Sequence, residues 1–175
     1  MEYLNTLDLG RSGIREVPSS IEHLTELEKL VLLECKNLGD LPYSIYKLQQ
    51  LQKLVTPTAK LRPTCDSFDG SSRYGFVNMT QLDFSWSKNV IELDLLMKFD
   101  YFPVLESINL SGTNIVTIPE SISRFPRLQH LNAKNCKLLR EIQGLPQSLI
   151  KVFVDGSMLL NTSPSGLFNQ VSLFL

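Results

Sequence analysis

An apolar motif, Leu-x-x-Leu-x-Leu, returns along most of this 175-residue chain and restricts its possible folds more than any other feature. Its copies begin at residues 4, 27, 51, 79, 105, 128 and 149, and three of them, at 4–9, 27–32 and 105–110, have a leucine or isoleucine at every apolar place. The copy that begins at Leu51 is disturbed by Thr56 and Pro57. Internal repeats of this kind predict stacked coils that share one interior.

The spacing between successive copies supports a repeat architecture. It is 23, 24, 28, 26, 23 and 21 residues, within the range of about 20 to 29 residues that is typical of leucine-rich repeats. We therefore expect an α/β solenoid: a leucine-rich repeat horseshoe of about seven coils, with short parallel strands on the concave face and short helical or loop returns. Residues 1–156 are assigned to the repeats. Residues 157–175 are expected to lead out of them toward a missing following domain, which would make the chain a fragment of a longer protein.

The return path of each coil has its own signal. A proline at 18, 42 or 119 is followed by a Ser-Ile pair and then by an apolar residue, Leu24, Leu48 or Phe125. Proline fixes φ and cannot donate a hydrogen bond, so it ends an extended segment and favours the first turn of a helix. We expect a short helix or 3₁₀ turn after each of these prolines.

A small side chain with a hydroxyl or thiol follows the third apolar place by three residues in most copies. These residues are Ser12, Cys35, Ser87, Thr113, Cys136 and Ser157. We interpret them as a structural ladder whose side chains bond to backbone groups of the neighbouring coil. Cys35 and Cys136 would then lie four coils apart, about 19 Å at the usual strand spacing, which is too far for a disulfide.

Residues that alternate with the leucines are expected to line the concave face, because neighbouring side chains of a strand point to opposite sides. The predicted protein-binding residues are Arg11, Lys29, Glu34, Asp83, Trp86, Asn109, His130, Lys134 and Phe153. Trp86 and Phe153 are the first candidates, since large aromatic groups dominate interface energetics. The alternative is structural: Trp86 packs on Tyr101 or the preceding loop, and Phe153 is covered by the C-terminal segment.

Residues 56–75 interrupt the periodicity and are rich in turn-forming residues. This irregular insertion is either a tolerated surface loop or a mobile element that contacts a partner. Its glycine-rich part, 70–75, lacks the Gly-Lys-Ser/Thr ending of a phosphate-binding loop. Cys65, within it, would be a free thiol with no catalytic role.

No catalytic pattern is visible elsewhere. The only histidines, His23 and His130, belong to no carboxylate or cysteine pattern typical of a catalytic or metal site, and the chain has no Gly-x-Ser-x-Gly nucleophile motif. We therefore expect no enzyme activity, no catalytic residue, no cofactor, no metal site and no small-molecule substrate in this chain.

The charge balance and the cysteine content restrict partners and compartment. Lys and Arg total 17 against 18 Asp and Glu, which provides no large positive field for nucleic acid or an anionic membrane. The chain shows no signal peptide, and its odd number of cysteines, 3, fits a reducing compartment. We expect a cytoplasmic or nucleocytoplasmic protein that binds other proteins.

The segments Gly-Thr-Asn-Ile-Val-Thr-Ile-Pro-Glu-Ser-Ile (112–122) and 128–149 closely resemble plant intracellular immune receptors of the TIR-type nucleotide-binding class with leucine-rich repeats. The sequence Leu-Pro-x-Ser-Leu at 145–149 resembles the exit from the repeats in that family. The resemblance implies a disease resistance protein that acts in plant defence signal transduction. Its partners would be a pathogen effector, the receptor's own nucleotide-binding domain, or both.

Three alternatives stay open at this stage. A general cytosolic leucine-rich repeat scaffold that binds a signalling protein would keep a steadier 23-residue period than the 28 and 26 found here. An extracellular receptor would need a signal peptide. An enzyme would require an activity for which the chain shows no motif, and the sequence does not identify the ligand.

Overall fold

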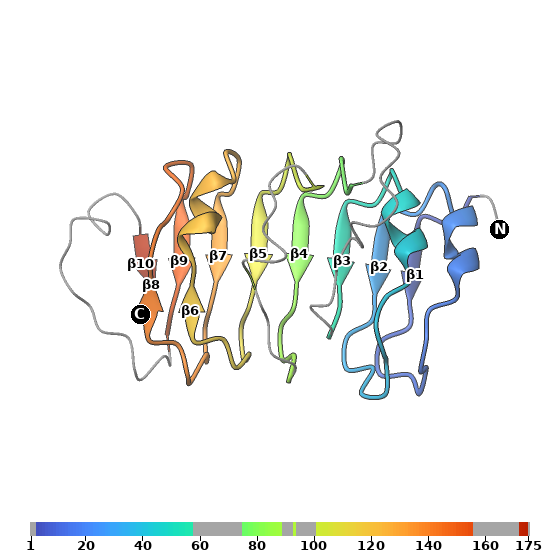
Figure 1. The fold of residues 1–175 in the computed structure, drawn as a ribbon, viewed down its shortest axis with the longest axis horizontal. Coiled ribbons are helices and arrows are strands. Elements are labelled where there is room, and N and C mark those ends of the chain that lie inside the picture. Colours follow the sequence, from blue (N-terminus) through green and yellow to red (C-terminus); the bar gives the residue numbers. More distant parts are fainter. Residues whose placement is uncertain (1–2, 58–74, 89–92, 94–100, 156–171, 175) are drawn as a thin grey trace.

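The computed structural model describes residues 3–57, 75–88, 93, 101–155 and 172–174. Within them, eight short parallel strands form one continuous sheet in the order β1-β2-β3-β4-β5-β7-β9-β10 (Figure 1). The strands are β1 (Thr6–Asp8), β2 (Lys29–Val31), β3 (Lys53–Val55), β4 (Gln81–Asp83), β5 (Ser107–Asn109), β7 (His130–Asn132), β9 (Lys151–Phe153) and β10 (Ser172–Phe174). Each strand lies beside that of the next coil, so the predicted solenoid of stacked parallel strands is confirmed.

The register of the sheet follows the repeat spacing residue by residue. The middle residues of the first seven strands lie opposite one another in the series Leu7, Leu30, Leu54, Leu82, Ile108, Leu131 and Val152. From Leu30 onward each of these side chains is buried, whereas the two residues that flank it are more exposed in almost every strand. The apolar repeat therefore forms a single interior on one side of the sheet.

Two features of the sheet go beyond the sequence prediction. The third strand forms in spite of Thr56, which takes the third apolar place, is 1% exposed and donates its N–H to the carbonyl oxygen of Asp83 at 2.9 Å. An eighth strand, β10, pairs in parallel with β9 and places Phe174 opposite Phe153 in the register. It lies within 157–175, where the sequence predicted no repeat.

The expected helical turns after Pro18, Pro42 and Pro119 are confirmed. They are the 3₁₀ helices η1 (Ser19–His23), η2 (Tyr43–Lys47) and η5 (Glu120–Arg124), and in each the preceding proline is the extended N-cap residue. Each helix buries one isoleucine, namely Ile21, Ile45 or Ile122. A second, two-stranded sheet of β6 (Thr117–Ile118) and β8 (Glu141–Ile142) joins two of the return segments.

Aromatic side chains fill the interior where the coils are longest. Phe76 and Phe102, which are 0% and 2% exposed, stack with ring centroids 5.5 Å apart. Tyr46 lies 4.9 Å from Phe76 and 6.4 Å from Tyr101, again between centroids. The equivalent position holds leucine in the first two coils, at Leu24 and Leu48, and phenylalanine again at the buried Phe125. Phenylalanine therefore occupies this interior position from the middle of the array up to Phe125.

Candidate protein-binding surface

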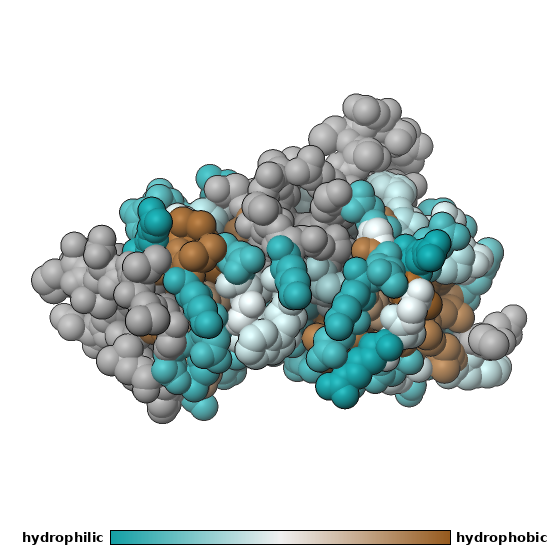
Figure 2. Space-filling model, turned by 90° about the horizontal axis from the view of Figure 1, so that it is seen from below, coloured by the Kyte–Doolittle hydropathy of each residue, from teal (hydrophilic) through white to brown (hydrophobic). Residues whose placement is uncertain are grey.

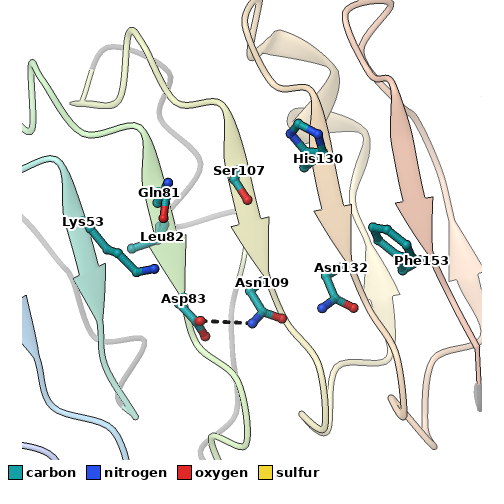
Figure 3. Close-up of a pocket in the computed structure, with 9 residues that line it drawn as sticks. All are labelled: Lys53, Gln81, Leu82, Asp83, Ser107, Asn109, His130, Asn132 and Phe153. Atoms are coloured by element: carbon teal, nitrogen blue, oxygen red, sulfur yellow. Dashed lines mark hydrogen bonds between the residues drawn. The ribbon is translucent and has the colours of Figure 1, made fainter.

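The candidate site lies on the side of the large sheet that faces away from the leucine interior, here called the open sheet face. A groove of about 330 Å³ crosses five of its strands, from β3 to β9. Its lining consists of Lys53, Gln81, Leu82, Asp83, Ser107, Asn109, His130, Asn132 and Phe153 (Figure 3). Because each strand contributes only one to three of the lining residues, the groove exists only when the coils are stacked.

Polar side chains at the ends of three strands are held in place by the backbone. Oδ1 of Asp83, Asn109 and Asn132 accepts a hydrogen bond from the N–H two residues later, at 2.8, 3.1 and 3.1 Å. Such Asx turns bend the chain away from the strand direction. Nδ2 of Asn109 also donates to Oδ2 of Asp83 at 3.0 Å and links two coils (Figure 3). The polar row is therefore fixed before any partner arrives.

A second row lies nearer the beginning of the strands. It contains Lys53, Gln81, Ser107 and His130, which come from four neighbouring strands and are drawn on the same face in Figure 3. Leu82 points to the opposite side in that view and is 1% exposed. The row combines a cation, an amide, a hydroxyl and an imidazole. It can therefore donate and accept hydrogen bonds along a partner's backbone or polar side chains.

Phe153 closes one end of the groove. Nζ of Lys134, which follows β7, lies 5.2 Å from the centroid of the Phe153 ring and 3.9 Å from Oδ2 of Asp155. A cation near an aromatic face at this distance is attracted by the ring quadrupole. The half-buried ring thus offers an apolar contact surface beside a positive charge.

The structure brings only some of the predicted binding residues together. Asp83, Asn109, His130 and Phe153 line the groove, and Lys29 lies on the same face in β2. Arg11 and Glu34 lie beyond the strand ends, where Arg11 Nε is 3.2 Å from Glu34 Oε2. The sequence analysis did not predict Lys53 as a binding residue, because Thr56 and Pro57 disturb the third copy of the motif. The spacing from Lys29 to Lys53 was the signal that could have placed it.

Trp86 is three residues beyond β4 rather than on the sheet, and it lines a different groove. It shares a left-handed backbone conformation with the equivalent residue of four other coils. The φ values are 59° at Arg11, 58° at Glu34, 59° at Trp86, 68° at Gly112 and 58° at Asn135. This bend turns every one of these coils out of the sheet. Only glycine and asparagine favour the conformation intrinsically, so just two of the five residues carried a sequence signal.

The ladder residues follow directly after these bends. Cys35 Sγ donates to the carbonyl oxygen of Leu9 at 3.1 Å, and Cys136 Sγ donates to that of Leu110 at 3.0 Å, in each case across to the preceding coil. Ser12 and Thr113 lie beside these thiols, each with its oxygen 3.6 Å from the sulfur. Ser87 donates instead to the carbonyl oxygen of Pro57 at 2.5 Å. Cys35 and Cys136 are both free and buried, whereas Ser157 and Cys65 lie outside the described residues.

Neither a metal cluster nor a membrane span is found among the described residues. Across the described parts of the chain, no cluster of three or more His, Cys, Asp or Glu side chains is arranged to hold a metal ion. In those same residues, no helix has the length and apolarity needed to cross a membrane.

Comparison with known proteins supports both the fold and the resemblance. A Leucine Rich Repeat family model matches residues 104–125. Disease resistance protein RML1B from Arabidopsis thaliana is 29% identical over 93% of this chain, and TMV resistance protein N from Nicotiana glutinosa is 28% identical over 85% of it. The chain spans only 19% and 17% of these two proteins. The resemblance to plant disease resistance proteins is confirmed.

A solved structure with a similar fold is the leucine-rich repeat domain of the type III effector XCV3220 (XopL). It superposes with a TM-score of 0.60 and 19% identity, over 91% of this chain and 63% of that one. At this identity the similarity shows the fold alone. Together with the parallel sheet, it shows that the predicted leucine-rich repeat architecture is correct.

Proposed function

Because the chain is a leucine-rich repeat solenoid whose curated relatives include plant disease resistance proteins, we propose that it is the protein-recognition module of a plant immune receptor. The observation that carries the proposal is the groove across five strands of the open sheet face. It offers fixed hydrogen-bonding groups and one aromatic ring to a large partner. Its physical role is binding by surface complementarity, with no catalytic step and no cofactor.

The rigidity of the groove supports recognition of a folded protein. Asp83 and Asn109 are tied both to the backbone and to each other, so little side-chain entropy is lost when a partner binds. Phe153 adds an apolar contact to the polar contacts that the other groove residues offer a partner. A surface that combines preorganised polar groups with an aromatic anchor resembles the centre of protein–protein interfaces.

In this proposal the partner is a pathogen effector, the receptor's own nucleotide-binding domain, or both in turn. Contact with the receptor domain would hold the receptor inactive, and contact with the effector would release it. The protein would act in the cytoplasm or in both cytoplasm and nucleus. A host signalling protein as the partner is the alternative, and it corresponds to a general leucine-rich repeat scaffold.

Site-specific crosslinking in plant cells tests this proposal. A photoreactive residue replaces Ser107, in the groove, or Ser123, an exposed serine of η5 that serves as the matched control. We expect a protein to crosslink through position 107 and not through position 123. His130→Ala and Phe153→Ala should then weaken binding of the purified partner, on the order of tenfold each for a residue at the centre of the interface, whereas Ser123→Ala should not.

The identity of the crosslinked protein separates the candidates. A pathogen protein or a nucleotide-binding domain supports the immune receptor, whereas a host signalling protein alone supports the general scaffold. Crosslinks that form equally through both positions, or binding that is unchanged in both groove variants, would remove the open sheet face as the recognition surface.

A further inference from the structure

A second groove, here called the rim groove, lies at the carboxyl ends of the strands and shares no residue with the groove on the open sheet face. Its volume is about 860 Å³, and its lining is Glu34, Cys35, Lys36, Leu38, Pro57, Ser85, Trp86, Ser87, Lys88, Gly112 and Asn114. Figure 2 views the molecule from this end of the strands and shows hydrophilic and near-neutral residues along its middle, with hydrophobic patches toward both ends.

Trp86 is held in a fixed position within the rim groove. A methyl group placed on Gly112 would lie only 2.4 Å from Cε3 of the indole, so the ring rests directly against the backbone of Gly112. The N–H of Trp86 donates to the carbonyl oxygen of Ser111 at 2.8 Å and fixes its backbone to the next coil. Even so, the residue is 61% exposed. One side of the indole is therefore supported and much of the rest is open.

The choice of glycine at position 112 is linked to this ring. Of the five left-handed bends in the described residues, four carry a residue with a side chain and only one carries glycine. The glycine is the one beneath the tryptophan. Since the other bends tolerate a side chain, the backbone conformation alone does not require glycine there. The space that the indole occupies does.

The charges around the indole favour an acidic partner. Lys36 and Lys88 both line the rim groove and are exposed. Neither ammonium has a carboxylate within ion-pair distance in the part of the chain that the structure describes. The carboxylate of the rim groove, that of Glu34, is paired with Arg11 at 3.2 Å. The described lining of the groove thus carries a net positive charge beside an open aromatic surface.

We propose that the rim groove binds an acidic protein segment that carries an aromatic or large aliphatic side chain. The apolar side chain packs against Trp86 while carboxylates of the segment approach Lys36 and Lys88. Charge complementarity of this kind steers the encounter and rejects basic segments, and the aromatic contact supplies affinity. This surface is separate from the open sheet face, so it does not depend on the function proposed for that face.

Trp86 provides a direct readout, because it is the only tryptophan in the chain. The probe is an acetylated, amidated peptide of the sequence Glu-Asp-Glu-Phe-Glu-Asp-Glu, titrated into the full chain while tryptophan emission is recorded. We expect a saturable blue shift that weakens as salt is added, since the attraction between charges is screened. A peptide with alanine in place of phenylalanine should bind more weakly, and one with lysine in place of every acidic residue should not bind.

Charge reversal supplies the matched protein controls. The double variant Lys36→Glu and Lys88→Glu should weaken binding on the order of tenfold or more, because two attractive charges become repulsive. Lys137→Glu is the control, since Lys137 follows Cys136 as Lys36 follows Cys35 but does not line the rim groove. It should change the affinity by less than about twofold. Circular dichroism verifies that each variant is folded.

The peptide titrations test binding at the rim groove and at no other surface. A shift with the acidic aromatic peptide that is lost in the double variant and kept in Lys137→Glu establishes the site. The absence of any shift up to millimolar peptide, equal shifts with the basic peptide, or equal losses in both protein variants would overturn it. None of these results bears on crosslinking through position 107, so failure here is distinguishable from failure of the proposed function.

Discussion

The coils from β5 to β9 and the coils from β3 to β5 stack in the same way but fill their interiors with different side chains. Between β5 and β9 the strands recur after 23 and 21 residues, and a single buried phenylalanine, Phe125, lies among smaller residues such as Leu131 and Ala133. Between β3 and β5 the strands recur after 28 and 26 residues, and phenylalanine fills the interior. The strand register is the same in both regions. The return path absorbs the extra length, and larger side chains fill the extra space.

The same comparison extends to the hydrogen bonds between coils. In the coil of β7, Cys136 donates to the carbonyl oxygen of Leu110 in the preceding strand segment. In the coil of β4, Ser87 donates to Pro57, which lies further along the preceding coil. The middle of the array therefore keeps a polar link at the bend but changes its acceptor. Regularity is strict in the sheet and relaxed outside it.

The largest expected effect tests whether the two regions are equally well packed. Phe76→Ala should lower the free energy of unfolding by about 4 kcal/mol, and Leu131→Ala should lower it by about 3 kcal/mol, because both side chains are fully buried. Urea denaturation of the two variants measures the difference. A cost for Phe76→Ala that is well below that for Leu131→Ala would show that the aromatic interior is loosely packed, and would break the comparison.

A smaller effect is expected at the junction between the two regions. Gly112→Ala should cost about 1 to 2 kcal/mol from the left-handed backbone alone. The added methyl group should also displace the indole of Trp86 and change its emission spectrum. Gly13→Ala is the matched control, since no atom lies within 4 Å of its added methyl group. Unchanged tryptophan emission in Gly112→Ala would contradict the contact.

A third prediction concerns the polar link of the regular coils. Cys136→Ala should cost about 1 kcal/mol, because it removes the thiol donor while the carbonyl oxygen of Leu110 keeps its bond from Thr113 Oγ1 at 2.6 Å. Cys136→Ser, which retains a donor, should cost less. Thermal denaturation of the two variants measures the difference. If serine costs more than alanine, the burial of the side chain rather than its hydrogen bond is what matters at this position.

The smallest expected effect lies in the aromatic interior. The hydroxyl of Tyr46 is buried and has no hydrogen-bond partner among the described residues, so Tyr46→Phe should leave stability unchanged or raise it by up to about 1 kcal/mol at neutral pH. Burial, and after it the neighbouring Tyr101 and Tyr43, raises the pKa of the Tyr46 phenol well above its ordinary value.

That raised pKa gives the same variant a second test, in alkali. The unfolded chain releases the phenol proton near its ordinary pKa of about 10. Keeping the Tyr46 phenol neutral in the folded state therefore costs nothing below that pH. As the pH rises above it, the unfolded chain ionises and the folded protein becomes relatively less stable. Tyr46→Phe should lose less stability than the unaltered protein between about pH 10 and 11, as followed by circular dichroism. Equal losses would mean that the phenol is solvated in the folded state.

The sequence predicted the elements that depend on buried apolar residues and on proline. The leucine spacing gave the strand register, and Pro18, Pro42 and Pro119 gave the 3₁₀ helices, because these residues act through local geometry and burial. β10 was missed. No copy of the apolar motif was recognised in its segment, although its distance from β9 repeats the 21-residue period between β7 and β9.

The candidate site was predictable only in part for a related reason. Alternation along a strand placed Asp83, Asn109 and His130 on the open sheet face, since it requires no knowledge of other coils. The same alternation wrongly placed Trp86 on the open sheet face. The Asx turn at Asp83 ends the alternation, and the left-handed bend then directs the indole to the rim. Aspartate or asparagine as the last residue of a strand was the available sign that the strand stops there.

The left-handed bends also have a consequence for how such an array diversifies. Arg11, Glu34 and Trp86 occupy a backbone conformation that does not depend on their side chains, and those side chains lie outside the leucine interior. A substitution at one of these corners exchanges a cation, an anion or an aromatic ring at the molecular edge and leaves the stacked strands as they were. These three coils thus each have a place where a point mutation changes what the protein contacts without changing how it folds.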